Sequence, residues 1–137
     1  MSTLKADKIS GTASTGVVIV TGEGGTNTAS LQQGLAKMWA NINQSTPAAS
    51  DSVNVASLTD HATGRVGANL TTNMSNTNYV FAMTGFDASS AGAGEAVHHG
   101  LDNQSQSTSQ CNHVSYNWSG SNVDNTKASM VIFGDLS

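Results

Sequence analysis

The chain has 137 residues and a mass of 14.0 kDa, which suits one domain or a small domain with an attached arm. Charged residues make up only 10% of it, and its five Lys and Arg cannot neutralise a run of phosphates, so nucleic-acid binding is excluded. No stretch approaches the roughly 18 apolar residues of a membrane span, and no cationic segment followed by an apolar one opens the chain. We therefore expect neither membrane insertion nor export by a signal of its own.

Residues 1–29 predict an N-terminal β arm that attaches the chain to other proteins. Residues 5–9 form a candidate short strand, residues 16–21 a strong one, and residues 22–25 a turn. No Lys-Ser or Lys-Thr pair follows the glycines at 22–25, which argues against a phosphate-binding loop. A hairpin of this size is marginal in water, so the arm needs a partner surface.

Residues 30–45 predict the one short α-helix, with Ser30 as its N-cap. Its apolar residues are spaced by four, three and four, which is a heptad seam. Two heptads are too short to hold a coiled coil alone. The helix therefore trimerises with support from the rest of the chain, packs as an amphipathic helix on its own domain's sheet, or does both at once. The candidate trimer-seam residues are Leu31, Leu35, Met38, Trp39 and Ile42.

Residues 46–137 predict a C-terminal antiparallel β-sandwich, because the hydrophobic pattern changes to a period of two. Residues 78–83 are apolar on both faces, which predicts a central strand. Residues 85–107 are small, polar and Gly-rich, and they predict a functional or disordered loop that contributes a sixth strand at most. The predicted strands are residues 52–58, 65–70, 78–83, 113–118 and 128–133, of which the first two form a hairpin.

Four linked stretches carry a resemblance to a known module. They are GLAKMWANIN at 34–43, DSVNVASLTDHATG at 51–64, LTTNM at 70–74 and NYV at 78–80, and VIFG at 131–134 matches the closing strand. In this order they strongly resemble a module common in the tail fibres of tailed bacteriophages, over about residues 34–84. Residues 2–9 also resemble the start of short structural proteins in phages of aquatic bacteria. The chain departs from the pattern at its hairpin turn, where His61 and Ala62 replace Asn-Gly.

The resemblance implies a homotrimeric virion protein with receptor contact at its tip. Without a long shaft before the module, a short tail fibre or knob-like appendage fits 137 residues best. The leading hypothesis is a non-enzymatic virion structural protein that binds other virion proteins through its arm and a host-surface glycan or protein through its loops. The alternative is a capsid or tail-junction decoration or cement protein with no receptor role. Low charge, an apolar arm strand and a short seam favour association independently of the resemblance.

The loops of residues 86–126 are the candidate receptor site, because Ser, Gly, Asn and Gln supply adaptable hydrogen bonds beside Tyr116 and Trp118. In the alternative interpretation these two rings point into the core. The candidate receptor-facing residues are Ser89, Ser90, His98, His99, Asn103 and Gln104.

Metal binding and catalysis have little support in the sequence. His98 and His99, with His113 further on, form the only histidine cluster, but adjacent side chains in a strand point to opposite faces. We expect exposed loop histidines, no metal and no cofactor. The acidic residues are scattered without a pair suited to acid–base work, so we expect no enzymatic activity. Cys111 cannot form an intrachain disulfide and is expected to be a small buried residue.

Overall fold

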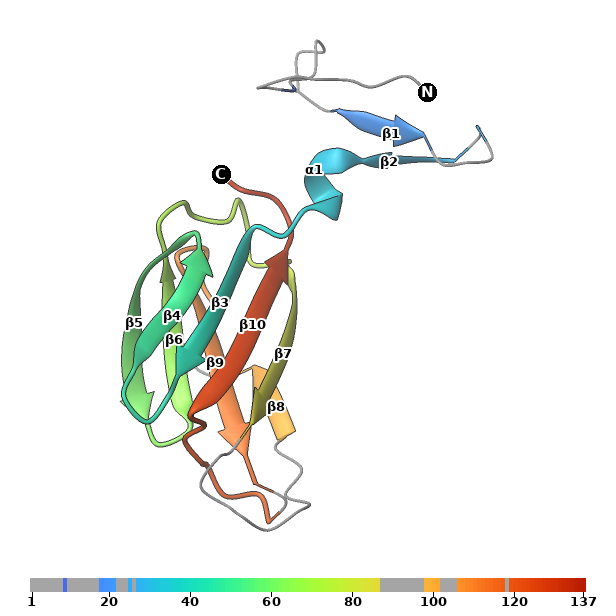
Figure 1. The fold of residues 1–137 in the computed structure, drawn as a ribbon. Coiled ribbons are helices and arrows are strands. Elements are labelled where there is room, and N and C mark those ends of the chain that lie inside the picture. The colour runs from blue at the N-terminus through green and yellow to red at the C-terminus, as the bar shows by residue number, and fades with distance from the viewer. Residues whose placement is uncertain are drawn as a thin grey trace. The chain divides into compact units, whose positions relative to one another are not determined.

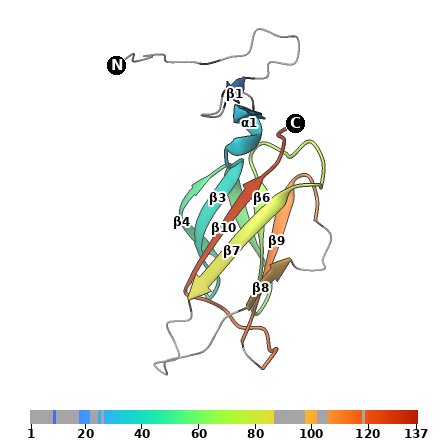
Figure 2. The ribbon, with the colours of Figure 1, turned by 90° about the vertical axis from the view of Figure 1, so that its right-hand side faces the viewer.

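The computed structural model describes residues 9, 18–21, 25, 27–86, 98–101, 106–117 and 119–137 (Figures 1 and 2). The chain divides into two compact units, Met1–Leu35 and Ala36–Ser137, which we call the N-terminal unit and the β body. Antiparallel strands dominate the described residues and the described helix is very short, which confirms a mainly β protein. No described helix is long and apolar enough to cross a membrane.

The N-terminal unit contains a two-stranded antiparallel ribbon and one helical turn. Strand β1 (Ile19–Thr21) pairs with β2 (Thr28–Ser30), and α1 (Leu31–Gly34) follows directly. The predicted strand over 16–21 is therefore found over its last three residues, while β2 was not predicted. Most of the predicted strand over 5–9, and residues 22–24 of the predicted turn, lie outside the described residues.

The predicted helix over residues 30–45 is wrong beyond Gly34. Leu35 is already extended, with ψ at 140°, and β3 (Met38–Asn43) is a six-residue strand. Met38, Ala40 and Ile42 are buried at a period of two, so the same apolar residues that suggested a heptad seam form one face of a strand. The segment forms a strand and not a helix because a neighbouring strand pairs with each of its two edges.

The β body consists of two four-stranded antiparallel sheets. In the first, which we call the front sheet, the order is β4 (Ala48–Val53), β3, β10 (Lys127–Phe133) and β7 (Val80–Phe86). In the second, the back sheet, the order is β5 (Val55–Ala62), β6 (Arg65–Leu70), β9 (Gln110–Tyr116) and β8 (His98–Leu101). The predicted hairpin is confirmed as β5 and β6. Strand β8 lies within residues 85–107, which were predicted to contribute at most one strand.

The two sheets face each other in both ribbon views (Figures 1 and 2), and one hydrophobic core draws its residues from both sheets. Each central strand contributes alternate residues, and burial of these side chains supplies the main stabilisation of the β body. The front sheet contributes Met38, Ala40, Ile42, Ala128, Met130 and Ile132, and the back sheet contributes Val66, Ala68, Leu70 and Cys111.

Asn54 turns the chain from the front sheet to the back sheet within the segment that we predicted as one strand. Its φ is +60°, a left-handed conformation that asparagine tolerates better than most residues. Its side-chain Nδ2 donates to the carbonyl oxygens of Lys37 and Thr72, both at 3.0 Å, and its Oδ1 accepts from the Thr72 N–H at 2.7 Å. The predicted strand over 52–58 is thus interrupted by a corner that the polar side chain stabilises.

The prediction of a central strand over residues 78–83 is also wrong. Strand β7 ends the order of the front sheet, and the described strands include none that pairs with its far edge. Phe81 and Met83 pack against the core, whereas Val80 and Ala82 are exposed on the other face. Apolar residues on both faces therefore reflect a second apolar surface and not a central position.

Candidate functional site

The outer face of the front sheet carries a row of apolar side chains that crosses all four strands. Trp39 on β3 lies opposite Val53 on β4 and opposite Val131 on β10. Val131 in turn lies opposite Ala82 on β7. We call these four residues the Trp39 row. Their neighbours along each central strand are core residues, so strand alternation places the row on the outside.

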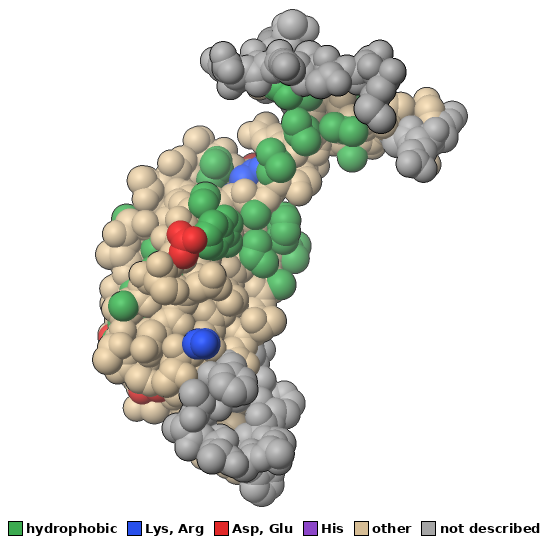
Figure 3. Space-filling model, in the orientation of Figure 1, with side chains coloured by type: hydrophobic (Ala, Val, Ile, Leu, Met, Phe, Trp, Pro, Cys, Tyr) green, Lys and Arg blue, Asp and Glu red, His purple; other side chains and the backbone are tan. Residues whose placement is uncertain are grey.

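Two further apolar side chains extend this surface at the next outward position. Phe133 on β10 is paired with Val80 on β7, and both are exposed, Val80 to 69%. Figure 3 shows hydrophobic side chains gathered over the upper part of this face. An exposed and continuous apolar patch on a sheet marks a surface that another molecule covers.

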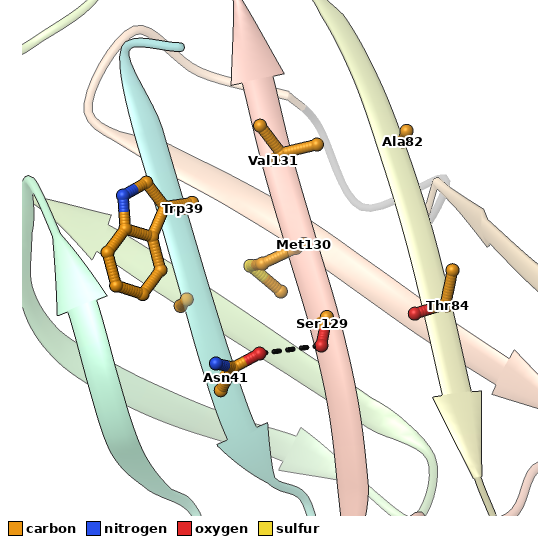
Figure 4. A pocket seen from close by; sticks show the side chains of 8 residues that line it. Trp39, Asn41, Ala82, Thr84, Ser129, Met130 and Val131 are labelled. Carbon is orange, nitrogen blue, oxygen red and sulfur yellow. Dashed lines mark hydrogen bonds between the residues drawn. The ribbon is translucent and has the colours of Figure 1, made fainter.

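A polar row runs beside the Trp39 row. Asn41 is paired with Asp51 and with Ser129, and Ser129 is paired with Thr84. The Ser129 Oγ donates to the Asn41 Oδ1 at 2.7 Å (Figure 4). Asp51 is the one charged residue among these four, so the centre of the face is uncharged.

A shallow hollow of about 230 Å³ lies between the two rows. Figure 4 shows it from nearby, with Trp39 on one side and Ala82 and Thr84 on the other. Its lining carries hydroxyl, amide and hydrocarbon groups and no acidic, basic or thiol side chain. Such a lining provides surface for packing and a few hydrogen bonds, and it holds no acidic or basic side chain that could activate the Ser129 or Thr84 hydroxyl.

The outer face of the back sheet has the opposite character. The Asn69 Nδ2 donates to the Ser57 Oγ and the Thr59 Oγ1, both at 2.9 Å, and the Asn69 Oδ1 accepts from the Gln110 Nε2 at 2.6 Å. On the same face, the His61 Nε2 lies 3.3 Å from the Asn112 Oδ1. The part of the back face formed by β5, β6 and the start of β9 is thus polar, in contrast to the Trp39 row of the front face.

A buried polar cluster joins the two sheets at the ends of β3 and β9. The Gln44 Nε2 lies 3.3 Å from the His113 Nδ1, and the Ser115 Oγ donates to the Gln44 Oε1 at 2.9 Å. The Asn125 N–H donates to the same Gln44 oxygen at 3.0 Å. His113 is fully buried, so the expectation of exposed loop histidines is wrong for this residue. Its hydrogen bonds give it a structural role.

The structure separates the predicted trimer-seam residues instead of aligning them. Met38 and Ile42 are buried in the core and cannot meet another chain. Leu31 and Leu35 belong to the N-terminal unit, where Leu35 is 54% exposed. Trp39 alone of the five lies on the apolar outer face, and the other members of that face were not predicted as site residues. Alternation outward from Met130 would have found Val131, whereas Val53 and Ala82 are joined to this face only by the register of the strands.

Most of the predicted receptor-facing residues lie outside the residues that the structure describes. Ser89, Ser90, Asn103, Gln104 and the ring of Trp118 are not described, and only the backbone of His98 and His99 is placed, in β8. Tyr116 is exposed, so its ring does not lie in the core. Within the described ranges, no group of three or more His, Cys, Asp or Glu side chains is arranged to hold a metal ion.

Cys111 is completely buried, as predicted, and its thiol is free. Burial raises the pKa of this thiol to about 12. Burial, with a smaller contribution from Cys111, likewise raises the pKa of the Tyr79 hydroxyl. A protonated thiol shielded from solvent is a poor nucleophile, so Cys111 packs as a small apolar residue.

No protein-family model matches the chain, and neither a curated protein nor a solved structure matches it.

Proposed function

We propose that this chain is a non-enzymatic virion structural protein that assembles as a homotrimer through the apolar outer face of its front sheet. The observation that carries the proposal is the contrast between the two outer faces. Hydrogen-bonded amide and hydroxyl groups suit the back face to water. In a single copy, the Trp39 row, Phe133 and Val80 would expose apolar surface to water on the front face.

The resemblance of residues 34–84 to the phage tail-fibre module supports the virion role. In this proposal the β body is the antiparallel β-sandwich of a short fibre or knob-like appendage on the tail or particle surface. The N-terminal unit attaches it to other virion proteins, since Ile19, Val20 and Leu35 expose aliphatic surface there. Residues 85–107 supply the contact with a host-surface glycan or protein. Three copies replace the predicted helical seam with a contact between sheet faces.

Light scattering of the purified chain at micromolar concentration tests the assembly. The expected mass is three times the chain mass of 14.0 kDa. A stable single-copy mass would contradict the proposal, because the apolar face would then be exposed in the native state. Electron microscopy of the phage that encodes the chain tests its location. A tail or fibre-tip position supports the appendage, and a regular array on the capsid or at the tail junction supports the decoration or cement role.

A further inference from the structure

The four outer edges of the two sheets differ in how they are protected against pairing with another strand. The pairing of β4 with β3 is shifted by an irregularity, and β4 carries Asp51. The pairing of β5 with β6 contains two such irregularities, and β5 carries Asp60. Strand β8 is only four residues long. Bulges, charges and short length are the usual devices that keep sheet edges from accepting further strands.

Strand β7 has none of these devices. Its seven residues, VFAMTGF, include no charge and no proline. They pair with β10 without interruption, from Phe133 opposite Val80 to Lys127 opposite Phe86. Alternate residues of such a strand present their N–H and C=O groups to the far edge, where no described strand meets them. A regular, uncharged edge favours the addition of an extended segment.

The side chains beside this edge favour an apolar segment. Val80 and Ala82 are exposed on β7 and continue the outer face that carries the Trp39 row. In an antiparallel or parallel added strand, alternate residues would lie next to them at the spacing of neighbouring strands, about 5 Å. An added strand with aliphatic side chains would therefore extend the apolar surface and cover its margin.

The N-terminal unit contains a strand of this kind. In β1, Ile19 is 61% exposed and Val20 is 48% exposed. Strand β1 pairs with β2 along one edge, through Val20 opposite Ala29, and their described sheet has only these two strands. A three-residue ribbon with exposed aliphatic side chains is marginal alone, so it gains most from a third strand.

We propose that β1 of one copy adds to the free edge of β7 of a neighbouring copy, so that each β body receives the arm of the next. This inference rests on the self-association proposed above. An arm-to-edge contact joins two different surfaces, and such a contact closes into a ring when repeated around a three-fold axis. Pairing of β7 with β7 would instead use the same surface twice and give a two-fold dimer.

Disulfide trapping between two differently tagged chains tests the exchange. Both chains carry Cys111→Ala, which removes the natural thiol; one adds Val20→Cys and the other Ala82→Cys. They are expressed together, oxidised mildly and separated on a non-reducing gel. We expect a covalent pair that contains both tags. A double variant, with Val20→Cys and Ala82→Cys in the same chain, should form linked products of up to three copies. Thr59→Cys, on the polar outer face of the back sheet, replaces Ala82→Cys as the matched control and should give no mixed pair.

Three other results overturn the inference. Linkage of Ala82→Cys chains to one another would mean that β7 pairs with β7. An internal disulfide within single copies of the double variant would mean that the arm folds onto its own β body. Repeating the trapping with Val80→Cys and Thr84→Cys covers a shifted register, and failure at all three positions overturns the exchange. If light scattering still gives the mass of three copies, only the arm exchange fails; if it gives a single copy, the proposed function fails as well.

Discussion

Trp39 and Val131 are paired across β3 and β10, and both side chains lie on the outer face of the front sheet. Each is flanked in its own strand by core residues, Met38 and Ala40 in one case and Met130 and Ile132 in the other. At Trp39 and Val131 the central strands are thus apolar on both sides. A sheet with hydrocarbon on both faces is typical of one that is covered on both faces.

Val131→Asp should separate the assembled copies. The change places a carboxylate in the middle of the Trp39 row, where covering it without a partner costs several kcal/mol, about 3 or more. We expect the mass measured by light scattering to fall to one copy while circular dichroism stays that of a β protein. Thr59→Asp is the matched control on the polar back face and should leave the mass unchanged. An assembled Val131→Asp protein would exclude this face as the interface.

Substitutions of Asn54 should separate its backbone effect from its hydrogen bonds. Asn54→Ala loses three side-chain hydrogen bonds and keeps a β-carbon at positive φ without the polar side chain that lets asparagine tolerate this conformation, so we expect the free energy of unfolding to fall by about 2–4 kcal/mol. Asn54→Gly loses the same bonds and tolerates the conformation, so its loss should be smaller by about 1 kcal/mol. Urea denaturation measures both, and a glycine variant no more stable than the alanine variant would contradict the strain at this corner.

Gly64 and Gly120 form a matched pair that separates the cost of steric crowding from the cost of a positive φ. Both have positive φ, +69° and +80°. A β-carbon at Gly64 would lie 2.7 Å from the Val123 nitrogen and 2.8 Å from the Ser115 carbonyl oxygen, whereas one at Gly120 meets nothing within 4 Å. Gly120→Ala should cost about 1–2 kcal/mol of unfolding free energy.

Gly64→Ala should cost a further ~1–3 kcal/mol because backbone atoms must move. Thermal or urea unfolding compares the two variants directly. Equal losses would mean that the turn at Gly64 has room that the structure does not show.

Stability should decline in alkali partly through Cys111. Burial raises the pKa of its thiol from 9.0 to about 12, so the folded state keeps a proton that the unfolded state releases. The contribution to the free energy of unfolding is therefore complete below pH 9 and is lost as the pH rises toward 12. Cys111→Ala should show a shallower decline over this interval in urea denaturation, with the remaining slope including that of Tyr79. If the unfolding free energy of the natural protein and of Cys111→Ala declined equally with pH, the buried thiol would not contribute to the alkaline loss of stability.

The sequence predicted the β5–β6 hairpin, whose outer face is polar, but predicted a helix over β3 and a central position for β7. Ser57, Thr59 and Asn69 are polar at every second position, so the β5–β6 hairpin was visible as a period of two. In Met38–Asn43 the outward Trp39 is apolar as well, and the period of two was masked by a helical spacing. Propensity alone cannot decide such a segment, because the neighbouring strands that pair with it are distant in sequence.

The candidate site was missed for the same reason. Trp39 was named because it lay beside a predicted helical seam, while Val53, Val131 and Ala82 came from three separate strands. Only the register brings the four into one row. The corner at Asn54 could not be foreseen either, since its partners are backbone groups of Lys37 and Thr72, far away along the chain.

The single-residue corner at Asn54 also restricts how this protein can change its length. Leu58 packs against the core and its neighbour Thr59 bonds to Asn69 on the outer face. Adding or deleting one amino acid at the corner would exchange these two orientations, and with them those of the residues that follow in β5. Insertions and deletions should therefore be tolerated in the turns between paired strands but not at Asn54. The corner at Asn54 sets which residues of β5 face the core and which face outward.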